Sequence, residues 1–198
     1  MFLLVASVLL LAVTWLTREP EAPSIAGALL ILALGLLLRT FIVQGLDGSD
    51  RMLLCAALGT ACWANLHLQS HWLGLAAWAG LTILLSIAYL DGGLSKVRHR
   101  GWRAGRQLAL ALNMKEFGNK ITARILLSRP RFAAFASWGV ILLELSAAPA
   151  LLFGGWVALV AGVLLAMMHA TIAVLMGLGR FFYPFVGALC FVIAVHPS

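Results

Sequence analysis

Charged residues are scarce in this chain of 198 residues. They make up 11% of the sequence, whereas hydrophobic residues make up 63%. Soluble domains carry about 25% charged residues. The composition therefore excludes a soluble globular domain and indicates an integral membrane protein. The chain has room for several bilayer crossings of roughly 20 residues each, with little left for a folded domain outside the lipid.

Cysteines and the common catalytic arrays are also poorly represented. The three cysteines, Cys55, Cys62 and Cys190, are scattered in apolar surroundings without a Cys-x-x-Cys pair. They support neither a disulfide framework nor a thiolate metal site, and we expect no metal. The sequence likewise offers no phosphate-binding loop, no Ser/His/Asp array and no repeat of the kind that marks transporters.

Long apolar runs, separated by turn and charge signals, fill most of the chain. They predict an all-α fold, a polytopic membrane helical bundle forming a single domain with about seven transmembrane helices. The helices are expected at about residues 2–17, 24–44, 52–68, 72–90, 132–153, 155–176 and 181–196. The first and last runs are short, so the count is six or seven.

Basic residues gather in one connecting segment. Ten of the 14 Lys and Arg lie between Tyr89 and Arg131. Lys and Arg near the ends of spans are retained on the cytoplasmic side. When the 91–131 loop is placed inside, every basic residue except Arg18 falls on that side. We therefore expect a multi-pass protein of the cell inner membrane, with a cytoplasmic N-terminus and an external C-terminus.

The basic loop also carries an apolar stripe. Met114, Phe117, Ile121 and Ile125 recur at helical spacing, which predicts an amphipathic helix along the membrane surface. Its basic side would lie on anionic lipid headgroups, whereas nucleic acid would need a basic surface on a soluble domain. The residues expected at headgroups are Arg98, Arg100, Arg103, Arg106, Lys115, Lys120 and Arg124.

One motif occupies the start of this segment. Tyr89, Gly93, Lys96 and Trp102 form the pattern Tyr-x3-Gly-x2-Lys followed by Trp. The pattern resembles a segment of the horizontally transferred transmembrane (HTTM) family, which also occurs in the membrane domain of vitamin K-dependent gamma-carboxylase. Two further stretches are similar to that family: Leu142-Leu-Glu-Leu-Ser-Ala-Ala-Pro149, and His169 through Met176-Gly-Leu-Gly-Arg-Phe181.

The resemblance implies a catalytic role for Lys96. In the carboxylase, the lysine of this motif is the base that is set up when reduced vitamin K is oxygenated. A lysine in an apolar pocket can act as a neutral amine, so this role is physically reasonable. It would make a lipophilic quinone the cofactor. The alternative is an interfacial lysine that snorkels to the headgroups.

Glu144 is unusual because it lies about midway along the apolar run 132–153. A charge at that depth is costly, so the side chain should face the bundle interior and either have a partner or be protonated. His169, central in the following run, is the expected partner. A hydrogen-bonded pair that fixes helix packing and a proton relay or substrate pocket both fit this placement, which makes Glu144 and His169 candidate catalytic residues.

Three classes of function remain. We expect a membrane subunit, or an assembly or scaffold component, that docks on another membrane protein through faces of small residues. The alternative is a membrane-embedded carboxylase-like or quinone-dependent enzyme that uses Lys96 as its base. A transporter is the third and is disfavoured, because a water-filled path needs more polar lining than these spans offer.

Overall fold

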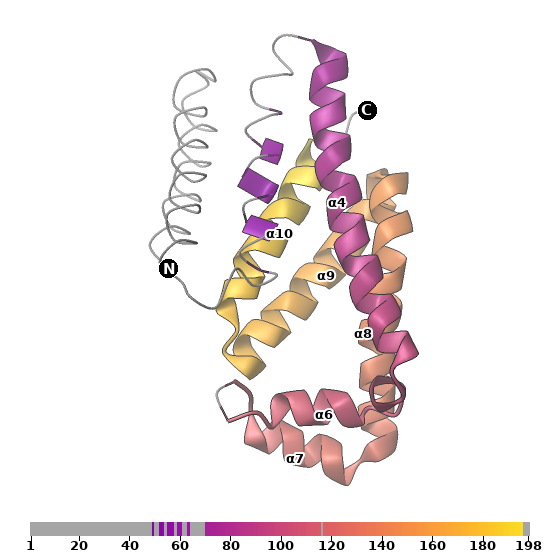
Figure 1. The fold of residues 1–198 in the computed structure, drawn as a ribbon, viewed down its shortest axis with the longest axis vertical. Coiled ribbons are helices and arrows are strands. Elements are labelled where there is room, and N and C mark those ends of the chain that lie inside the picture. Colours follow the sequence, from indigo (N-terminus) through magenta and orange to yellow (C-terminus); the bar gives the residue numbers. More distant parts are fainter. Residues whose placement is uncertain are drawn as a thin grey trace. The chain divides into compact units, whose positions relative to one another are not determined.

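The computed structural model describes residues 49, 52, 53, 55–57, 59, 60, 63, 70–115 and 117–195. All the regular structure among them is helical (Figure 1). The helices that the structure bounds are α4 (His71–Arg98), α5 (Arg100–Arg103), α6 (Arg106–Leu112), α7 (Lys120–Ser128), α8 (Pro130–Phe153), α9 (Gly155–Met176) and α10 (Gly179–Ala194). The helices expected at 2–17 and 24–44, and much of the one at 52–68, lie outside the described residues.

Three of these helices are long and apolar enough to cross a membrane: Gly74–Arg98 within α4, Pro130–Phe153 and Gly155–Met176. The all-α class is thus confirmed for this part of the chain, and the three long apolar helices agree with a membrane protein, while the count of seven stays a prediction. α9 has the predicted bounds. α8 begins earlier than predicted, at Pro130, because proline lacks an N–H and has a fixed φ that suits the first helical turn.

α4 continues well past its predicted end. Residues 91–98 were expected to begin the basic loop, but they are helical as far as Arg98. Gly92 and Gly93 lie within α4, where a small residue permits close approach to a neighbouring helix. Tyr89, Gly93 and Lys96 therefore share one face of one helix, since they follow each other at four and three residues.

The predicted single surface helix is wrong, because three short helices occupy the segment. Gly118 has a φ of +135°, and Asn119 begins a new helix by accepting hydrogen bonds from the backbone N–H groups of Ile121 and Thr122. Met114 and Phe117 consequently lie in the connection between α6 and α7. Ile121 and Ile125 lie in α7 itself.

The chain divides into two compact units, residues 1–82 with 183–198, and residues 83–182. In the first, the indole Nε1 of Trp78 donates a 2.9 Å hydrogen bond to the carbonyl of Val192. In the second, α6 and α7 lie side by side and pack against α8 (Figure 1). Their contact is a small apolar core of Ala109, Leu112, Ala123, Leu126 and Ala133, joined by Leu108, Leu175 and Met176.

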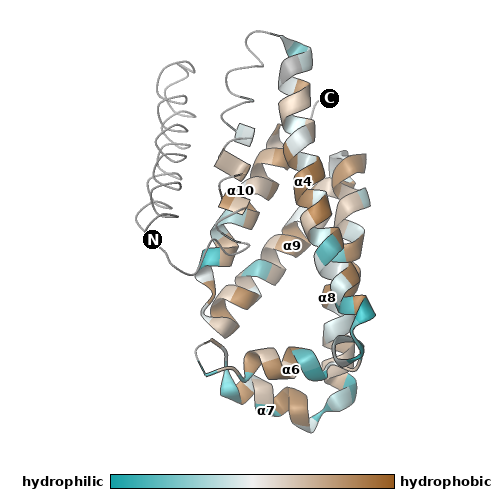
Figure 2. Ribbon diagram, viewed as in Figure 1, coloured by the Kyte–Doolittle hydropathy of each residue, from teal (hydrophilic) through white to brown (hydrophobic). Residues whose placement is uncertain are grey.

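Apolar residues predominate along α8 and α9, whereas the second half of α4 also carries hydrophilic residues (Figure 2). Hydrophilic residues are frequent where α5, α6 and α7 lie (Figure 2). The second unit therefore has an apolar helical part and a polar end. The motif extends from Tyr89 on α4 to Trp102 on α5, which belongs to the polar end.

Candidate functional site

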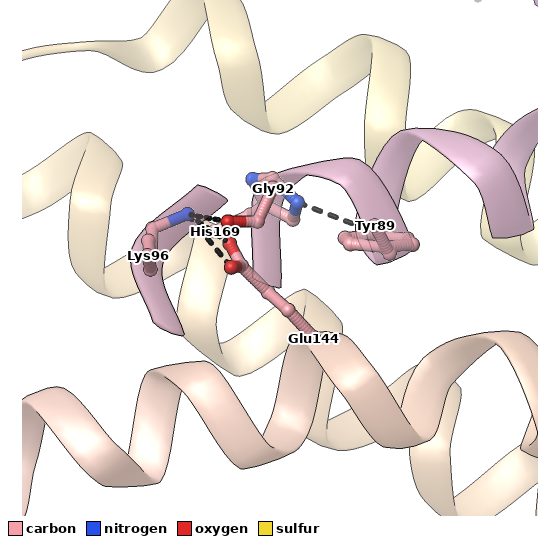
Figure 3. Close-up of polar contacts among 5 residues, drawn as sticks. All are labelled: Tyr89, Gly92, Lys96, Glu144 and His169. Atoms are coloured by element: carbon pink, nitrogen blue, oxygen red, sulfur yellow. Dashed lines mark hydrogen bonds and ion pairs between the residues drawn. The ribbon is translucent and has the colours of Figure 1, made fainter. Parts of the chain in front are cut away.

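The centre of the site is an ion pair between α4 and α8. The Lys96 Nζ donates to both carboxylate oxygens of Glu144, at 2.8 Å to Oε1 and 2.7 Å to Oε2 (Figure 3). The side chains are largely withdrawn from the surface, with 20% of Lys96 and 11% of Glu144 exposed. A two-point contact of this kind neutralises both charges within the bundle.

Lys96 differs from the other basic residues of its segment. Arg98, Arg100, Arg103 and Arg106 on α4, α5 and α6 are exposed. Lys115, Lys120 and Arg124, also expected at lipid headgroups, are exposed as well. Lys96 instead turns toward α8, and its Nζ also lies 3.4 Å from the Gly92 carbonyl and 5.4 Å from the centre of the Trp102 ring. Its contacts are with the interior of the unit, not with the outer surface.

A second polar pair joins α4 to α9. The Tyr89 Oη lies 3.0 Å from the His169 Nε2, in a hydrogen bond between two buried side chains (Figure 3). The expected partner of Glu144 was His169. Its two-point partner is Lys96, because α4 extends far enough to bring that lysine alongside α8.

The two glycines of the motif leave room for these contacts. A Cβ on Gly93 would lie 2.8 Å from the Leu145 Cδ2 and 3.2 Å from the Leu145 backbone nitrogen. Any larger residue there would push α4 away from α8. A Cβ on Gly92 would lie 3.5 Å from the Glu144 Oε2 and 3.6 Å from the Lys96 Nζ, so this glycine borders the ion pair directly.

Trp102 completes the motif from the short helix α5. Its carbonyl accepts a 2.6 Å hydrogen bond from the Ser137 hydroxyl on α8, and its ring faces the Lys96 ammonium. A cation near the face of an indole ring is attracted by the ring quadrupole. All four residues of the motif thus border the same region of the unit.

Several contributors were missed at the level of sequence. Ser137 belongs to no recognisable pattern and is identified only by its hydrogen bond to the Trp102 carbonyl. Leu145 lies in the stretch Leu142–Pro149, but only its contact with Gly93 distinguishes it from its apolar neighbours. Gly92 is identified by its place beside the ion pair. One signal was available: Tyr89, Gly92, Gly93 and Lys96 are spaced as one face of a continuous helix, which would have predicted a shared surface.

Lys96 and Glu144 together can hold or pass one proton. When an ammonium proton moves from the Lys96 Nζ to a Glu144 oxygen, the ion pair becomes a neutral amine and a neutral acid. In water the ion pair is strongly favoured by solvation, whereas a poorly solvated site reduces that advantage. The pair can therefore present a neutral amine without expelling a charge into lipid.

Comparison with known proteins returns no match, either to a family model, to a curated protein or to a solved structure. The resemblance to the HTTM family therefore stays a prediction, supported by the residues quoted for it. The contacts described for the motif are those of this chain's own structure, with no related structure to compare them with.

Proposed function

We propose that this chain is a membrane-embedded enzyme that exchanges a proton with a lipophilic, quinone-like molecule at the Lys96–Glu144 pair. One observation carries the proposal. Side chains able to transfer protons converge from three helices, with Tyr89 and Lys96 on α4, Glu144 on α8 and His169 on α9. Ionisable residues in transmembrane segments are costly and are usually retained for function.

The proposed step uses Lys96 as the base. Glu144 takes one proton from the Lys96 ammonium, and the neutral amine then takes a proton from an O–H group of the bound molecule in its reduced, quinol form. The Lys96 Nζ becomes an ammonium again, and the negative charge left on the bound molecule lies beside it. Glu144 is the temporary proton store, so no net charge has to enter the lipid.

A quinone fits the polar groups that the residues offer. Its oxygens accept hydrogen bonds. Tyr89 and His169 bond each other, so the pair offers one further donor, either the Tyr89 hydroxyl or the His169 imidazole according to the tautomer. The Lys96 ammonium is another donor when it turns from the Gly92 carbonyl. When bound, it would supply the redox chemistry that these side chains lack.

A second candidate is a membrane subunit or assembly component of a larger complex. The observation that favours it is that each residue of the motif also holds helices together, as in the approach of Gly93 to Leu145 and the hydrogen bond from Ser137 to Trp102. In that case the motif would stabilise a scaffold. A second membrane protein would be the partner.

For either candidate we propose that the polar end of the unit faces the cytoplasm across a cell inner membrane. The support is the positive-inside rule, since the segment from Lys96 to Arg131 contains ten basic residues and a single acidic one, Glu116. Maleimide labelling of a Ser128→Cys variant in intact cells and in inverted vesicles tests this orientation. Labelling from the outside would contradict it.

The two candidates are separated by a paired substitution. Lys96→Met with Glu144→Leu replaces both charges by apolar groups and leaves no unpaired charge behind. We expect the double variant to fold and to co-purify with any membrane partner, yet to lose the phenotype that the wild-type gene confers. Retention of the phenotype in a folded double variant would overturn the enzyme proposal and favour the scaffold.

Binding can be measured directly with decylubiquinone as the probe. Because the Trp102 ring lies near Lys96, a quinone at the site should quench its fluorescence in a saturable manner. The saturable part should be lost in a Trp102→Phe control and in the Lys96→Met, Glu144→Leu variant. Saturable quenching that survives in both would place the quinone elsewhere.

A further inference from the structure

α7 has an apolar side that the second unit does not cover. Ala123 and Leu126 face inward and belong to the small core with α6 and α8. Ile121 and Ile125, four residues apart and therefore on one side of the helix, are 72% and 46% exposed. Two large aliphatic side chains on a short helix thus lack cover from the described part of the chain.

Basic side chains flank these isoleucines. Lys120 and Arg124 each come one residue before an exposed isoleucine, and both are exposed. No acidic residue lies within α7. The surface of α7 is therefore an apolar strip with a cationic edge, a pattern typical of helices that lie at a membrane surface.

The position of α7 in the chain, directly before α8, bears on what covers its apolar side. It ends at Ser128, and α8 begins at Pro130. Phe132 and Phe135, in the first turns of α8, are 54% and 77% exposed, as expected of side chains that face lipid. Exposed apolar side chains therefore occur both on α7 and, a few residues further along the chain, in the first turns of α8.

We propose that α7 lies in the headgroup layer of an anionic lipid leaflet, with Ile121 and Ile125 in the acyl boundary and Lys120 and Arg124 on lipid phosphates. The charge of α7 is complementary to such a leaflet. A bilayer suits this surface better than a soluble protein, because α8, which follows α7 directly in the chain, also exposes large apolar side chains, Phe132 and Phe135, in its first turns. The inference is independent of the enzyme proposal.

The test uses the full-length chain in vesicles. Ile121→Cys and Ile125→Cys variants, made after replacement of Cys55, Cys62 and Cys190, are labelled with an environment-sensitive fluorophore. Asn113→Cys, an exposed polar position at the end of α6, is the matched control. The vesicles contain phosphatidylcholine, with or without phosphatidylglycerol, and emission is quenched either by lipids with a nitroxide near the headgroup or by aqueous iodide.

With anionic vesicles, we expect the nitroxide lipids to quench positions 121 and 125 at least about twofold more than position 113, with iodide showing the reverse order. Replacing Lys120 and Arg124 by Gln should reduce this difference in anionic vesicles and leave it unchanged in neutral ones. Circular dichroism confirms that each labelled variant is folded.

Two results would overturn the proposal. Equal access of iodide to all three positions in both kinds of vesicle would mean that the strip faces water. Protection of positions 121 and 125 from both quenchers would mean that a protein covers the strip, either a second copy or a partner.

Discussion

The Lys96 ammonium contacts both oxygens of the Glu144 carboxylate, at 2.8 and 2.7 Å, and so links the end of α4 to the middle of α8. The link joins residues 48 positions apart in the sequence. It is an ion pair within the unit of residues 83–182. Its removal has different consequences depending on whether one charge or both are lost.

Replacing only one partner should destabilise the protein. Glu144→Gln leaves the Lys96 charge without a counter-charge and should lower the free energy of unfolding by roughly 3 kcal/mol, the lower end of the range because a fifth of Lys96 is exposed. Denaturation of the detergent-solubilised protein, followed by circular dichroism, measures the change. The Lys96→Met, Glu144→Leu variant should recover most of the loss. If Glu144→Gln is as stable as the wild type, the pair does not form.

Gly93→Ala should weaken the contact between α4 and α8. The new methyl group would lie 2.8 Å from the Leu145 side chain and 3.2 Å from its backbone, and overpacking of this kind costs about 1–3 kcal/mol. Gly139→Ala in α8 is the matched control, because a Cβ there meets none of the described atoms within 4 Å. The same unfolding measurement should show little change for the control, and equal losses for both variants would contradict the close approach.

Gly105→Ala should be more damaging. Gly105 has a φ of +73°, and a Cβ there would lie 2.2 Å from the backbone of Ala133. Gly177 has a similar φ of +68° with no described atom within 4 Å of its Cβ position. Gly177→Ala should therefore cost only the backbone strain, about 1–2 kcal/mol. Gly105→Ala should cost clearly more, and a difference of zero in unfolding free energy would mean that the turn before α6 does not press on α8.

Ser137→Ala should release α5 from α8. The variant loses the 2.6 Å hydrogen bond to the Trp102 carbonyl, a loss of about 1 kcal/mol. Ser146→Ala on the same helix is the control, since the Ser146 hydroxyl is exposed and donates to the Leu143 carbonyl of its own helix. Hydrogen exchange of the α5 amides should rise in Ser137→Ala alone. Unchanged exchange would show that this bond does not hold α5.

Local chemistry was sufficient to predict parts of this fold. The bounds of α9 follow from the glycines on either side, since Gly154 and Gly177 both have positive φ and end the helical run. The start of α8 follows from Pro130. In these places a single proline or glycine determines the backbone conformation, so the sequence alone predicts where the helix begins or ends.

The site itself depends on packing and was only partly predictable. Lys96, Glu144 and His169 were each singled out, but the pairing was not, because the end of α4 was placed near residue 90. Gly92 and Gly93 have weak helical propensity, and their position inside α4 is favoured by the contact of Gly93 with Leu145. That contact joins segments far apart in sequence, which no local pattern records.

Tyr89, Lys96, Glu144, His169 and the residues that position them all fall within one of the two compact units, residues 83–182. The residues of the site are therefore encoded by one continuous part of the coding sequence, the codons for residues 83–182. A recombination event at either border would transfer it whole, whereas an exchange within the stretch would separate Lys96 from Glu144. Chimaeras between distant homologues should accordingly tolerate crossovers outside this stretch better than within it.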